Sequence, residues 1–564
     1  MYDSLMDHFA QSKPQKISRK DRKEAEISMR SSPSSSCSLQ ETEKSKWKPT
    51  TKELWIMITC ALSSLVVALD ATILVPVLPT LAVELHGTST QTFWTGTAYL
   101  LSHAVLQPFI ATLSDLFGRR EALAPSILLF AAGSVICGVA HNFAVMLAGR
   151  VVQGCGGAGI ITLSQLIFAD LVPLRQRPQW FAMVLASWAI GTLVGPLIGG
   201  LLVENATWRW CFWLNLPICG LTFPMAVFFL SELTRPEDSS TDTLASVDWI
   251  GNILFACSLT WFLVAISWAG IHFDWSSWQT IVPLVVGAAG IMITIGYEAK
   301  LAKFPFLRRG CFSSISTNAC YVAAMLHGLT LYMALYYVSF YFSSVKFYGA
   351  VRTGTSLFPA TALMLPGSAI VSALITRFGR FRWAIWVGYT LSTIAVGLFI
   401  LWNHDTPTWL WAFSLSLLGL GMGMILSSVN FSIQASVEPE DAGQAAAMYA
   451  FVRSVGMTIG VAVGGTVFQN EMKRKLRSLG VQNATELAKE AEEFIHQLSA
   501  MAMTGSEGEL RRRILDGYVA GFRGVWFTMT SLAGAGLVVS LLIKKGNLDS
   551  VLKSRFRVRR DDVV

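Results

Sequence analysis

Apolar segments of similar length alternate with short polar segments along most of the chain. From about residue 54 to residue 543 each apolar segment is near twenty residues long, the length that an α-helix needs to cross the hydrocarbon core of a bilayer. Apolar residues run continuously in them and do not alternate with polar ones, which favours helices over a membrane barrel. The pattern predicts fourteen membrane-spanning helices. They begin near Leu54, Thr95, Ala122, Phe143, Trp180, Cys211, Trp249, Trp278, Asn318, Gly354, Trp383, Trp409, Gln444 and Gly524.

The composition agrees with an all-α membrane protein. Of the 564 residues, 53% are hydrophobic and 14% are charged, whereas soluble domains carry about 25% charged residues. The nine cysteines are spread over the spans and the N-terminal tail without a CxxC pair. This distribution indicates neither a disulfide framework nor a metal site, and we expect no metal and no cofactor.

The net charge of +8 is unevenly distributed along the chain. The basic residues of the short loops follow even-numbered spans: Arg119, Arg120, Arg175, Arg177, Lys300, Lys303, Arg308, Arg309, Arg377, Arg380 and Arg382. By the positive-inside rule both termini are cytoplasmic, with residues 1–50 forming a disordered tail and residues 544–564 a basic one. Because topology accounts for the basic residues, we expect no nucleic-acid partner.

One long loop, residues 471–517, falls on the predicted outer face. It contains a charged helical stretch and the sequon Asn483-Ala-Thr485, which makes Asn483 a candidate glycosylation site. We expect the loop to form a solvated cap.

A glycine-rich motif lies within the fifth span. Gly191, Gly195 and Gly199 recur every four residues, so they share one helix face and permit close approach of a neighbouring helix. Gly200 follows directly, and Pro196 removes a backbone donor between these glycines. The motif predicts either two helices that slide or rock against each other or a tightly packed static pair.

The chain contains an internal repeat. A shift of 265 residues carries the glycine motif onto Gly456, Gly460, Gly464 and Gly465, and carries Gly154 and Gly156 onto Gly419 and Gly421. The repeat predicts two six-helix halves, residues 51–235 and 315–543, with two inserted helices at 245–300. Parallel halves with the substrate path between them are the plan of the major facilitator fold.

Several motifs resemble those of a known family. Residues 111–120 are similar to the loop motif of the major facilitator superfamily, and residues 147–156 to its fourth-span motif. Residues 69–79, 208–217 and 451–456 resemble fourteen-span drug:H⁺ antiporters, although Ala111, Leu116 and Pro76 depart from the usual residues. The resemblance extends over nearly the whole of residues 54–543.

The resemblance implies a proton-coupled exporter rather than an enzyme, similar to fungal exporters of toxins and drugs. It would move a small organic molecule out of the cytoplasm by alternating access, as a monomer in the plasma membrane, with a vacuolar or vesicle membrane as the alternative location. A siderophore or nutrient importer on the same frame and a non-transporting sensor are the competing hypotheses. The sequence contains no P-loop for ATP-driven transport.

Two charged residues are candidates for proton coupling. Asp70 lies sixteen residues into the first span, about 24 Å along it, and Arg150 lies early in the antiparallel fourth span, at a similar depth. An ionisable residue in the bilayer core costs about 2.5–3.5 kcal/mol and therefore needs a reason. We expect Asp70 to take up and release the proton, with Arg150 stabilising the carboxylate in one state only. A permanent ion pair is the alternative.

Further candidates concern gating and substrate contact. By resemblance to the family, Asp115, Gly118, Arg119 and Arg120 form a loop that latches the cytoplasmic side closed. Polar, charged and aromatic side chains within the spans are candidates for substrate contact, with bridging between helices as the alternative. They are Gln107, Gln153, Tyr337, Tyr341, Asn430, Gln434 and Arg453.

Overall fold

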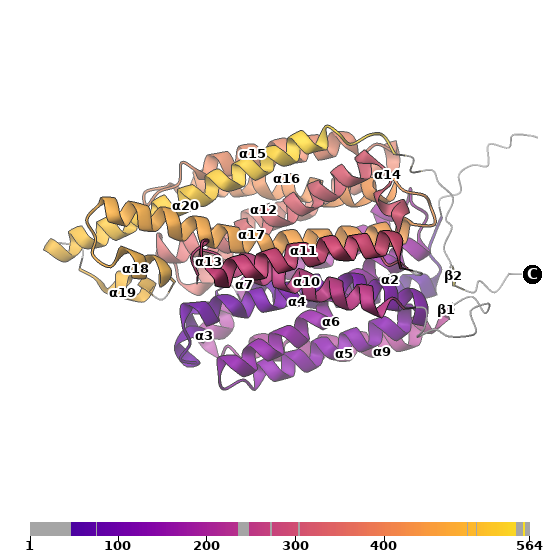
Figure 1. Ribbon diagram of the computed structural model, residues 1–564, viewed down its shortest axis with the longest axis horizontal. Helices are drawn as coiled ribbons and strands as arrows, with labels where there is room; N and C mark the ends of the chain where they lie inside the picture. The colour runs from indigo at the N-terminus through magenta and orange to yellow at the C-terminus, as the bar shows by residue number, and fades with distance from the viewer. Residues whose placement is uncertain are drawn as a thin grey trace, which may run out of the picture. The chain divides into compact units, whose positions relative to one another are not determined.

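The computed structural model describes residues 47–74, 76–234, 247–270, 273–302, 305–492, 494–502, 505–546, 548 and 557–558. The predicted tails, residues 1–50 and 544–564, lie largely outside these ranges. Residues 49–564 form one compact unit, which is almost entirely helical (Figure 1). The strands of its described residues are β1 (Leu233–Thr234) and β2 (Arg557–Val558), which pair antiparallel.

The first long helices pack on one another and lie together in Figure 1. They are α2 (Thr51–Ile73), α4 (Ser89–Phe117), α5 (Arg119–Gly138), α6 (Phe143–Leu171), α7 (Arg177–Asn205) and α9 (Asn215–Phe229), with the short helices α3 (Leu78–Glu84) and α8 (Trp210–Trp213) and the 3₁₀ turn η1 (Leu230–Glu232) between or after them. Close van der Waals packing holds apolar helices of this kind together in a bilayer, and capping residues fix where some of them begin. Thr50, for example, accepts from the Glu53 amide in a capping box.

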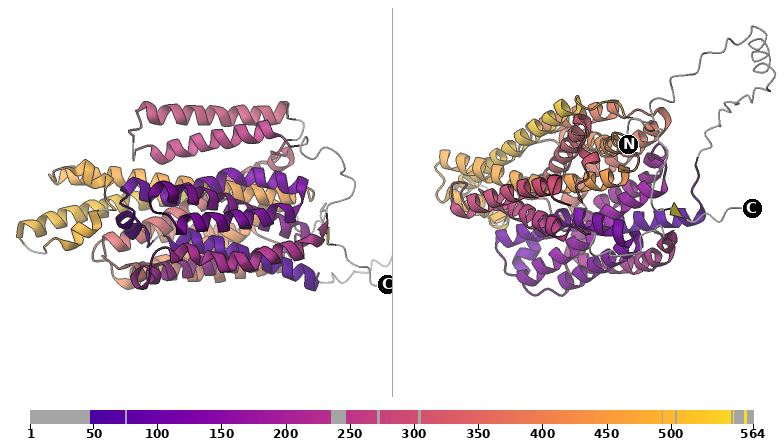
Figure 2. Two further views of the ribbon diagram at one scale, coloured as in Figure 1. Left: turned by 90° about the horizontal axis from the view of Figure 1, so that it is seen from below. Right: turned by 45° about the vertical axis from the view of Figure 1, so that its right-hand side comes forward.

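Two helices, α10 (Trp249–Trp268) and α11 (Trp278–Lys300), form a hairpin on the outside of the bundle (Figures 1 and 2). α10 contacts both α4 and α17. Large apolar side chains of α11, including Val285, Met292 and Ile293, are exposed.

The remaining long helices form a second packed group. They are α12 (Ile315–Ser344), α14 (Phe358–Phe378), α15 (Arg382–Phe399), α16 (Thr408–Gln434), α17 (Ala442–Ser478) and α20 (Gly505–Ser540), with η2 (Arg309–Phe312), α13 (Ala350–Ser356), α18 (Ala484–Lys489) and α19 (Phe494–Ala500) as shorter elements. We call the end of the bundle near α3, α18 and α19 the α19 end, and the opposite one the β1 end.

Helix contacts in the first group recur in the second. α2 packs on α7 as α12 packs on α17, and α4 packs on α6 as α14 packs on α16. The pairs α5–α6 and α5–α9 correspond in the same way to α15–α16 and α15–α20. Two equivalent contacts, α7–α14 and α4–α17, join the groups. This arrangement is what a twofold internal repeat requires.

The repeated glycines carry these equivalent contacts. A Cβ on Gly154 would lie 2.6 Å from the Tyr99 carbonyl oxygen of α4, and the corresponding Gly419 meets Ala360 of α14. Gly156 faces α5, and Gly421 faces α15. The glycine spacing therefore sets how closely the helices of each group approach.

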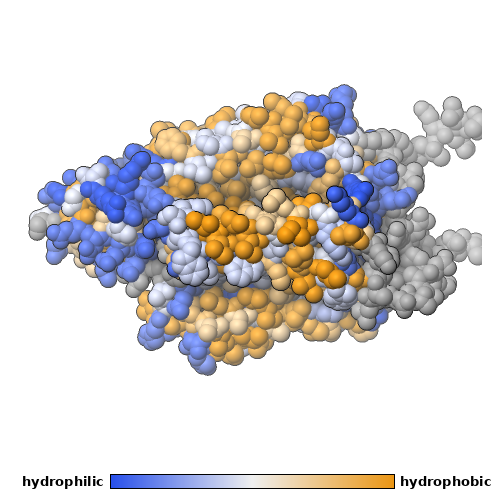
Figure 3. Space-filling view, in the orientation of Figure 1, coloured by the Kyte–Doolittle hydropathy of each residue, from blue (hydrophilic) through white to orange (hydrophobic). Residues whose placement is uncertain are grey.

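Thirteen helices of the described residues have the length and apolar composition of a membrane span. The remaining predicted span, which begins near Trp383, is present as α15, but its 18 residues are less apolar than the best stretch of each of the others. Figure 3 shows an apolar belt around the middle of one face, with hydrophilic residues at both ends. An exposed apolar surface of this kind fits a lipid bilayer.

The predicted loop at 471–517 is corrected by the structure. α17 continues to Ser478 and α20 begins at Gly505, so much of this segment belongs to two long helices. α18 and α19 lie between them, and Ala488, Ala491 and Leu498 are buried. The segment is thus a packed cap, because its short helices carry apolar residues as well as charges.

Candidate functional site

Asp70 and Arg150 form a buried ion pair inside the first helix group. Arg150 Nη1 donates to Asp70 Oδ2 at 2.7 Å, and the side chains are 0% and 1% exposed. The Nε atom of Arg150 donates to the Thr95 carbonyl at 2.9 Å, and its guanidinium lies 4.3 Å from the centre of the Tyr99 ring. Three helices, α2, α4 and α6, therefore fix one charge pair.

Two amides complete the hydrogen bonding of Asp70. Gln153 Nε2 donates to Asp70 Oδ1 at 2.6 Å, and Asn215 Nδ2 donates to the same oxygen at 2.9 Å. Both amides also contact Ser134 Oγ. Gln153, predicted to contact substrate, thus belongs to this network. Asn215 and Ser134 were missed, although an asparagine inside an apolar span is the sequence feature that could have identified the first.

The glycine motif positions the helix that carries Asp70. A Cβ on Gly191 would lie 2.8 Å from both Ala68 Cβ and Leu69 N of α2, while Gly195 faces Thr72 and Gly199 faces the Ile73 carbonyl. These glycines hold α2 against α7 within one turn of Asp70.

A second face of the motif packs on the other helix group. A Cβ on Gly200 would lie 2.8 Å from Val351 N, and one on Gly354 would lie 2.8 Å from the Pro196 carbonyl carbon. α7 is continuous through Pro196. The motif therefore contacts both α2 and the α13–α14 segment.

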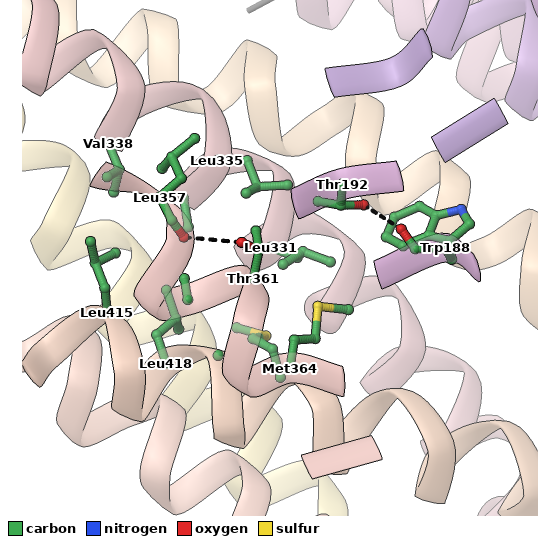
Figure 4. A pocket seen from close by; sticks show the side chains of 14 residues that line it. Trp188, Thr192, Leu331, Leu335, Val338, Leu357, Thr361, Met364, Leu415 and Leu418 are labelled. Carbon is green, nitrogen blue, oxygen red and sulfur yellow. Dashed lines mark hydrogen bonds between the residues drawn. The ribbon is translucent and has the colours of Figure 1, made fainter. Parts of the chain in front are cut away.

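The corresponding region of the second helix group is apolar. Arg150 corresponds to Leu415 under the 265-residue shift, and Leu415 lines a cavity of about 20 Å³ with apolar side chains from α12, α14 and α16 (Figure 4). The hydroxyl groups of Thr192 and Thr361 on its wall donate to carbonyls of their own helices. Only the first group provides a charged network at this position.

A larger cavity, of about 680 Å³, lies at the α19 end. Its lining comes from both groups and from the cap, and includes Leu78, Glu204, Tyr336, Phe340 and Glu492. Tyr336 Oη donates to Glu492 Oε1 at 2.5 Å. Burial raises the pKa of the Glu492 carboxyl.

A smaller cavity lies beside the charged network and adjoins the larger one. It measures about 60 Å³ and shares Leu78 and Tyr336 with the larger cavity. Arg150 and Tyr99 also line it. The network is thus approached from the α19 end.

At the β1 end, Asp115 contacts residues of three separate segments. Its carboxylate accepts from Arg119 Nη1 at 2.7 Å, from Arg308 Nη2 at 3.2 Å and from Gln444 Nε2 at 2.9 Å. Arg308 also contacts Asp441 at 3.4 Å. The latch role of Asp115 stays a prediction, and Arg308 and Gln444 are partners that the sequence did not indicate.

The other predicted loop residues support this position. Gly118 has φ 113°, a backbone conformation that residues other than glycine rarely adopt. It caps the C-terminus of α4, directly before α5 begins. Arg119 is buried and also binds Asp170 at 2.8 Å, so it is not a solvated loop residue. Arg120 is half-buried.

Asn430 and Gln434 form a second cross-link at the β1 end. Gln434 donates to Asn430 at 2.8 Å, and Asn430 donates to Gln165 Oε1 of α6 at 3.2 Å. Arg177 of α7 donates to Gln434. Phe181 and Phe431 meet edge to face. The two groups are therefore sealed against each other at this end, whereas the larger cavity lies at the opposite end.

Gln107 of α4 and Arg453 of α17 each contact a residue of the other helix group. Gln107 Nε2 donates to Ser454 Oγ at 3.2 Å, and the Arg453 guanidinium lies 5.0 Å from the centre of the Trp188 ring. Under the 265-residue shift Arg453 corresponds to Trp188, so these equivalent positions face each other.

Tyr337 and Tyr341 are packed into helix contacts. Their hydroxyl groups donate to the carbonyls of Val461 and Asn403, at 3.0 and 2.6 Å, and their rings pack against Phe468 and Trp402. This packing does not support substrate contact. Their neighbours Tyr336 and Phe340 line the larger cavity. Asn483 is exposed at the start of α18, and its glycosylation stays a prediction.

The family model described as Major Facilitator Superfamily matches residues 60–461. The chain is 37% identical over 506 residues to "MFS transporter L2" of Phoma sp., covering 89% of this chain and 84% of the relative. It is 33% identical to "MFS efflux transporter aclA" of Aspergillus oryzae, covering 89% and 91%. It is 29% identical to "Efflux pump FUS6" of Gibberella moniliformis, covering 90% of each chain.

Two solved structures share the fold at 16% identity. The human organic anion transporter MFSD10 has a TM-score of 0.52, covering 80% of this chain and 99% of that one. A bacterial homologue of the lysosomal transporter Spinster, inward-facing and occupied, has a TM-score of 0.56, with coverage of 89% and 98%. The relatives are named as transporters, in agreement with the expectation that the chain is not an enzyme. The chain belongs to the Major Facilitator Superfamily and is a multi-pass membrane transporter.

Proposed function

We propose that this protein is a proton-coupled exporter that moves a small organic molecule out of the cytoplasm by alternating access. The observation that carries the proposal is the fully buried Asp70 with its three side-chain donors, Arg150, Gln153 and Asn215. A carboxylate in a membrane interior is costly, and these residues make its charge depend on one arrangement of α2, α6 and α9. A proton on Asp70 would replace the Arg150 contact when that arrangement changes.

The cavities support a direction for the proton. Basic loop residues gather at the β1 end, which makes that end cytoplasmic by the positive-inside rule. The α19 end would then face outward, and the 60 Å³ cavity beside Arg150 would give outside protons access to Asp70. In the opposite state, opening of the β1 end would release the proton to the cytoplasm.

Export is supported by the relatives. Two of them are named as an efflux transporter and an efflux pump. We extend this activity to the present chain, with a secondary metabolite or foreign compound as the substrate class and the plasma membrane as the location.

The test is pH-gradient-driven uptake of rhodamine 123 and of its free acid, rhodamine 110, into inverted membrane vesicles. We expect wild type to accumulate at least one dye when the lumen is acidic, and Asp70→Asn to lose this response. Arg150→Ala should also lose the response to the gradient, because Asp70 then remains buried without its ion-pair partner. Wild-type uptake that ignores the gradient, or normal gradient-driven uptake by Asp70→Asn, would contradict the proposal.

A second measurement needs no substrate. Spin labels at the exposed Phe117 and Phe378 report the separation of the two groups at the β1 end. We expect this distance distribution to change from acidic to neutral pH in wild type and to stay fixed in Asp70→Asn. A pH response that persists in Asp70→Asn would assign the titrating group elsewhere.

A further inference from the structure

Arg453 is a buried cation at the junction of the two helix groups. Its side chain lies in α17, and the residue is 8% exposed. Its Nε atom contacts His327 Nδ1 at 3.4 Å, and its Nη2 atom has no hydrogen-bond partner among the described residues. No ion pair of the described residues includes Arg453. An arginine stays charged, so this charge has an aromatic face beside it but no counter-ion.

The buried carboxylate of Asp70 does not compensate this charge. Asp70 already accepts from Arg150, Gln153 and Asn215, and its pairing with Arg150 leaves that network without net charge. The junction therefore keeps one unbalanced positive charge.

Further unpartnered polar atoms lie on α4, which contacts α17 at this junction. Gln107 donates to Ser454, the next residue in α17, and contacts His103 at 3.1 Å. Among the described residues, Gln107 Oε1, His103 Nδ1 and Tyr99 Oη have no hydrogen-bond partner, although each atom is buried.

Gly157 leaves room at two of these atoms. A Cβ on Gly157 would lie 2.8 Å from Tyr99 Oη and 3.2 Å from His103 Nδ1. The missing side chain lets a hydroxyl group and a ring nitrogen face the same space. Buried polar groups are nearly always paired in proteins, so several unpaired ones near a guanidinium that has no counter-ion indicate a ligand.

Apolar surface adjoins this polar cluster. Trp188, which lies under the Arg453 guanidinium, also lines the 20 Å³ cavity with Leu331 and Met422 (Figure 4). The Met422 carbonyl contacts His327 Nε2 at 3.1 Å. The cluster and the apolar wall are thus adjacent parts of one site between α4, α7, α12, α16 and α17.

We infer that the transported molecule is an amphipathic organic acid whose carboxylate, or an equivalent oxyanion, binds Arg453. The guanidinium supplies paired N–H donors to two oxygens, and the apolar part of the molecule packs on Trp188 and the adjoining wall. This inference rests on the proposed transport function and names its substrate class. Because Arg453 and Trp188 belong to different helix groups, the bound acid joins the two groups midway between the ends.

The experiment measures binding of two dyes that differ only at the acid. Rhodamine 110 has a carboxylate, and rhodamine 123 is its methyl ester. Fluorescence polarisation with the purified full-length chain gives both affinities. We expect wild type to bind rhodamine 110 at least about tenfold more tightly than rhodamine 123. Equal binding, tighter binding of the ester, or no binding of either dye would overturn the inference.

Substitutions identify the residue that causes the preference for the acid over the ester. Arg453→Gln should reduce the ratio of the two affinities to near one, whereas Arg453→Lys should keep a preference for the acid. Arg352→Gln is the control, because Arg352 also lies over an aromatic ring, that of Tyr348, but is exposed near the α19 end. A preference that survives in Arg453→Gln would assign the acid to another residue. Should Arg453→Gln fail to fold, the retained preference of Arg453→Lys and its altered rhodamine 110 affinity provide the test, and an unaltered affinity counts against the site.

Failure of this inference is distinguishable from failure of the proposed function. Gradient-driven uptake with equal affinity for acid and ester would reject only the anionic substrate class. Preferred binding of the acid without any effect of the pH gradient would reject only the proton coupling.

Discussion

At the scale of single residues, the arrangement of charge differs between the middle of the protein and the cap. Asp70 is enclosed by donors from several helices, so its charge is tied to the packing of a whole helix group. Glu492 is half-buried between α18 and α19, and its contact with Tyr336 joins the cap to α12. The charge of Glu492 therefore affects how readily the cap docks on α12.

We predict that docking of the cap depends on pH through Glu492. Burial raises the pKa of this carboxyl in the docked state, whereas a freed glutamate has a pKa of about 4.3. The docked state then binds more protons between the two pKa values, so docking is strongest below the lower value and weakens as pH rises through the upper one. Glu492→Gln retains an acceptor for Tyr336 and should remove the dependence.

Hydrogen exchange of the α18 and α19 amides measures this opening. The ratio of wild-type to Glu492→Gln rates at each pH cancels the intrinsic dependence of exchange on pH. We expect the ratio to rise with pH, with exposed Glu486→Gln behaving like wild type. A ratio that stays constant, or falls, would contradict the prediction.

At the scale of elements, the contact between α2 and α7 depends on missing side chains. Gly191, Gly195 and Gly199 face the backbone or side chains of α2, and the matching glycines of α17 face α12. Pro196 has Val461 as its counterpart, so close packing is common to both groups and the proline belongs to one.

We predict that Gly199→Ala forces α2 and α7 apart, because the added Cβ would clash with the Ile73 carbonyl. Overpacking of this kind costs about 1–3 kcal/mol, which should lower the midpoint of thermal unfolding in detergent. Gly220→Ala in α9 is the matched control, since its Cβ would meet no atom within 4 Å. Equal midpoints for the two variants would show that the α2–α7 contact accommodates the added Cβ without loss of stability.

The sequence predicted elements better than partners. Spans followed from the length of apolar segments, and the pairing of equivalent helices followed from the glycine repeat. The depth of Asp70 and Arg150 along their spans was sufficient to predict their contact. Depth alone does not give the rotation of a helix about its axis, so Tyr337 and Tyr341 were expected to contact substrate although their rings pack on Phe468 and Trp402.

Contacts between distant segments were harder to predict. Arg308 meets Asp115 across 193 positions of the chain, and no local pattern relates the two. Asn215 joins the Asp70 network because α9 packs on α2, which is a property of the tertiary fold.

At the scale of the whole molecule, the two helix groups are joined at the β1 end and separated by a large cavity at the α19 end. Under the proposed alternating access, such a state would be one end point, with the groups rocking about the site between them. The polar contacts at the β1 end then set the balance between the two end points.

We predict that Asp115→Ala shifts this balance toward opening at the β1 end. The variant loses the contacts to Arg308 and Gln444, which belong to other segments. Partly exposed pairs of this kind contribute about 1 kcal/mol, or roughly a fivefold change in the ratio of states. The spin-label distance between positions 117 and 378 should show a larger fraction of long distances.

Asp405→Ala provides the control for this measurement, because Asp405 pairs with His404 in an exposed loop. We expect its distance distribution to match that of wild type. A latch without a role in gating would leave Asp115→Ala indistinguishable from this control.

The hairpin of α10 and α11 gives the two seams between the helix groups unequal access to lipid. Trp249 and Trp268 pack on Phe109 and Trp94 of α4, while Phe255 packs on Phe451 of α17. The α4–α17 seam is therefore covered by a strap anchored on both sides, and the α7–α14 seam has no equivalent hairpin among the described residues. The bilayer can therefore border the contact between the two groups more directly at the uncovered seam, where Pro196 of α7 lies against Gly354.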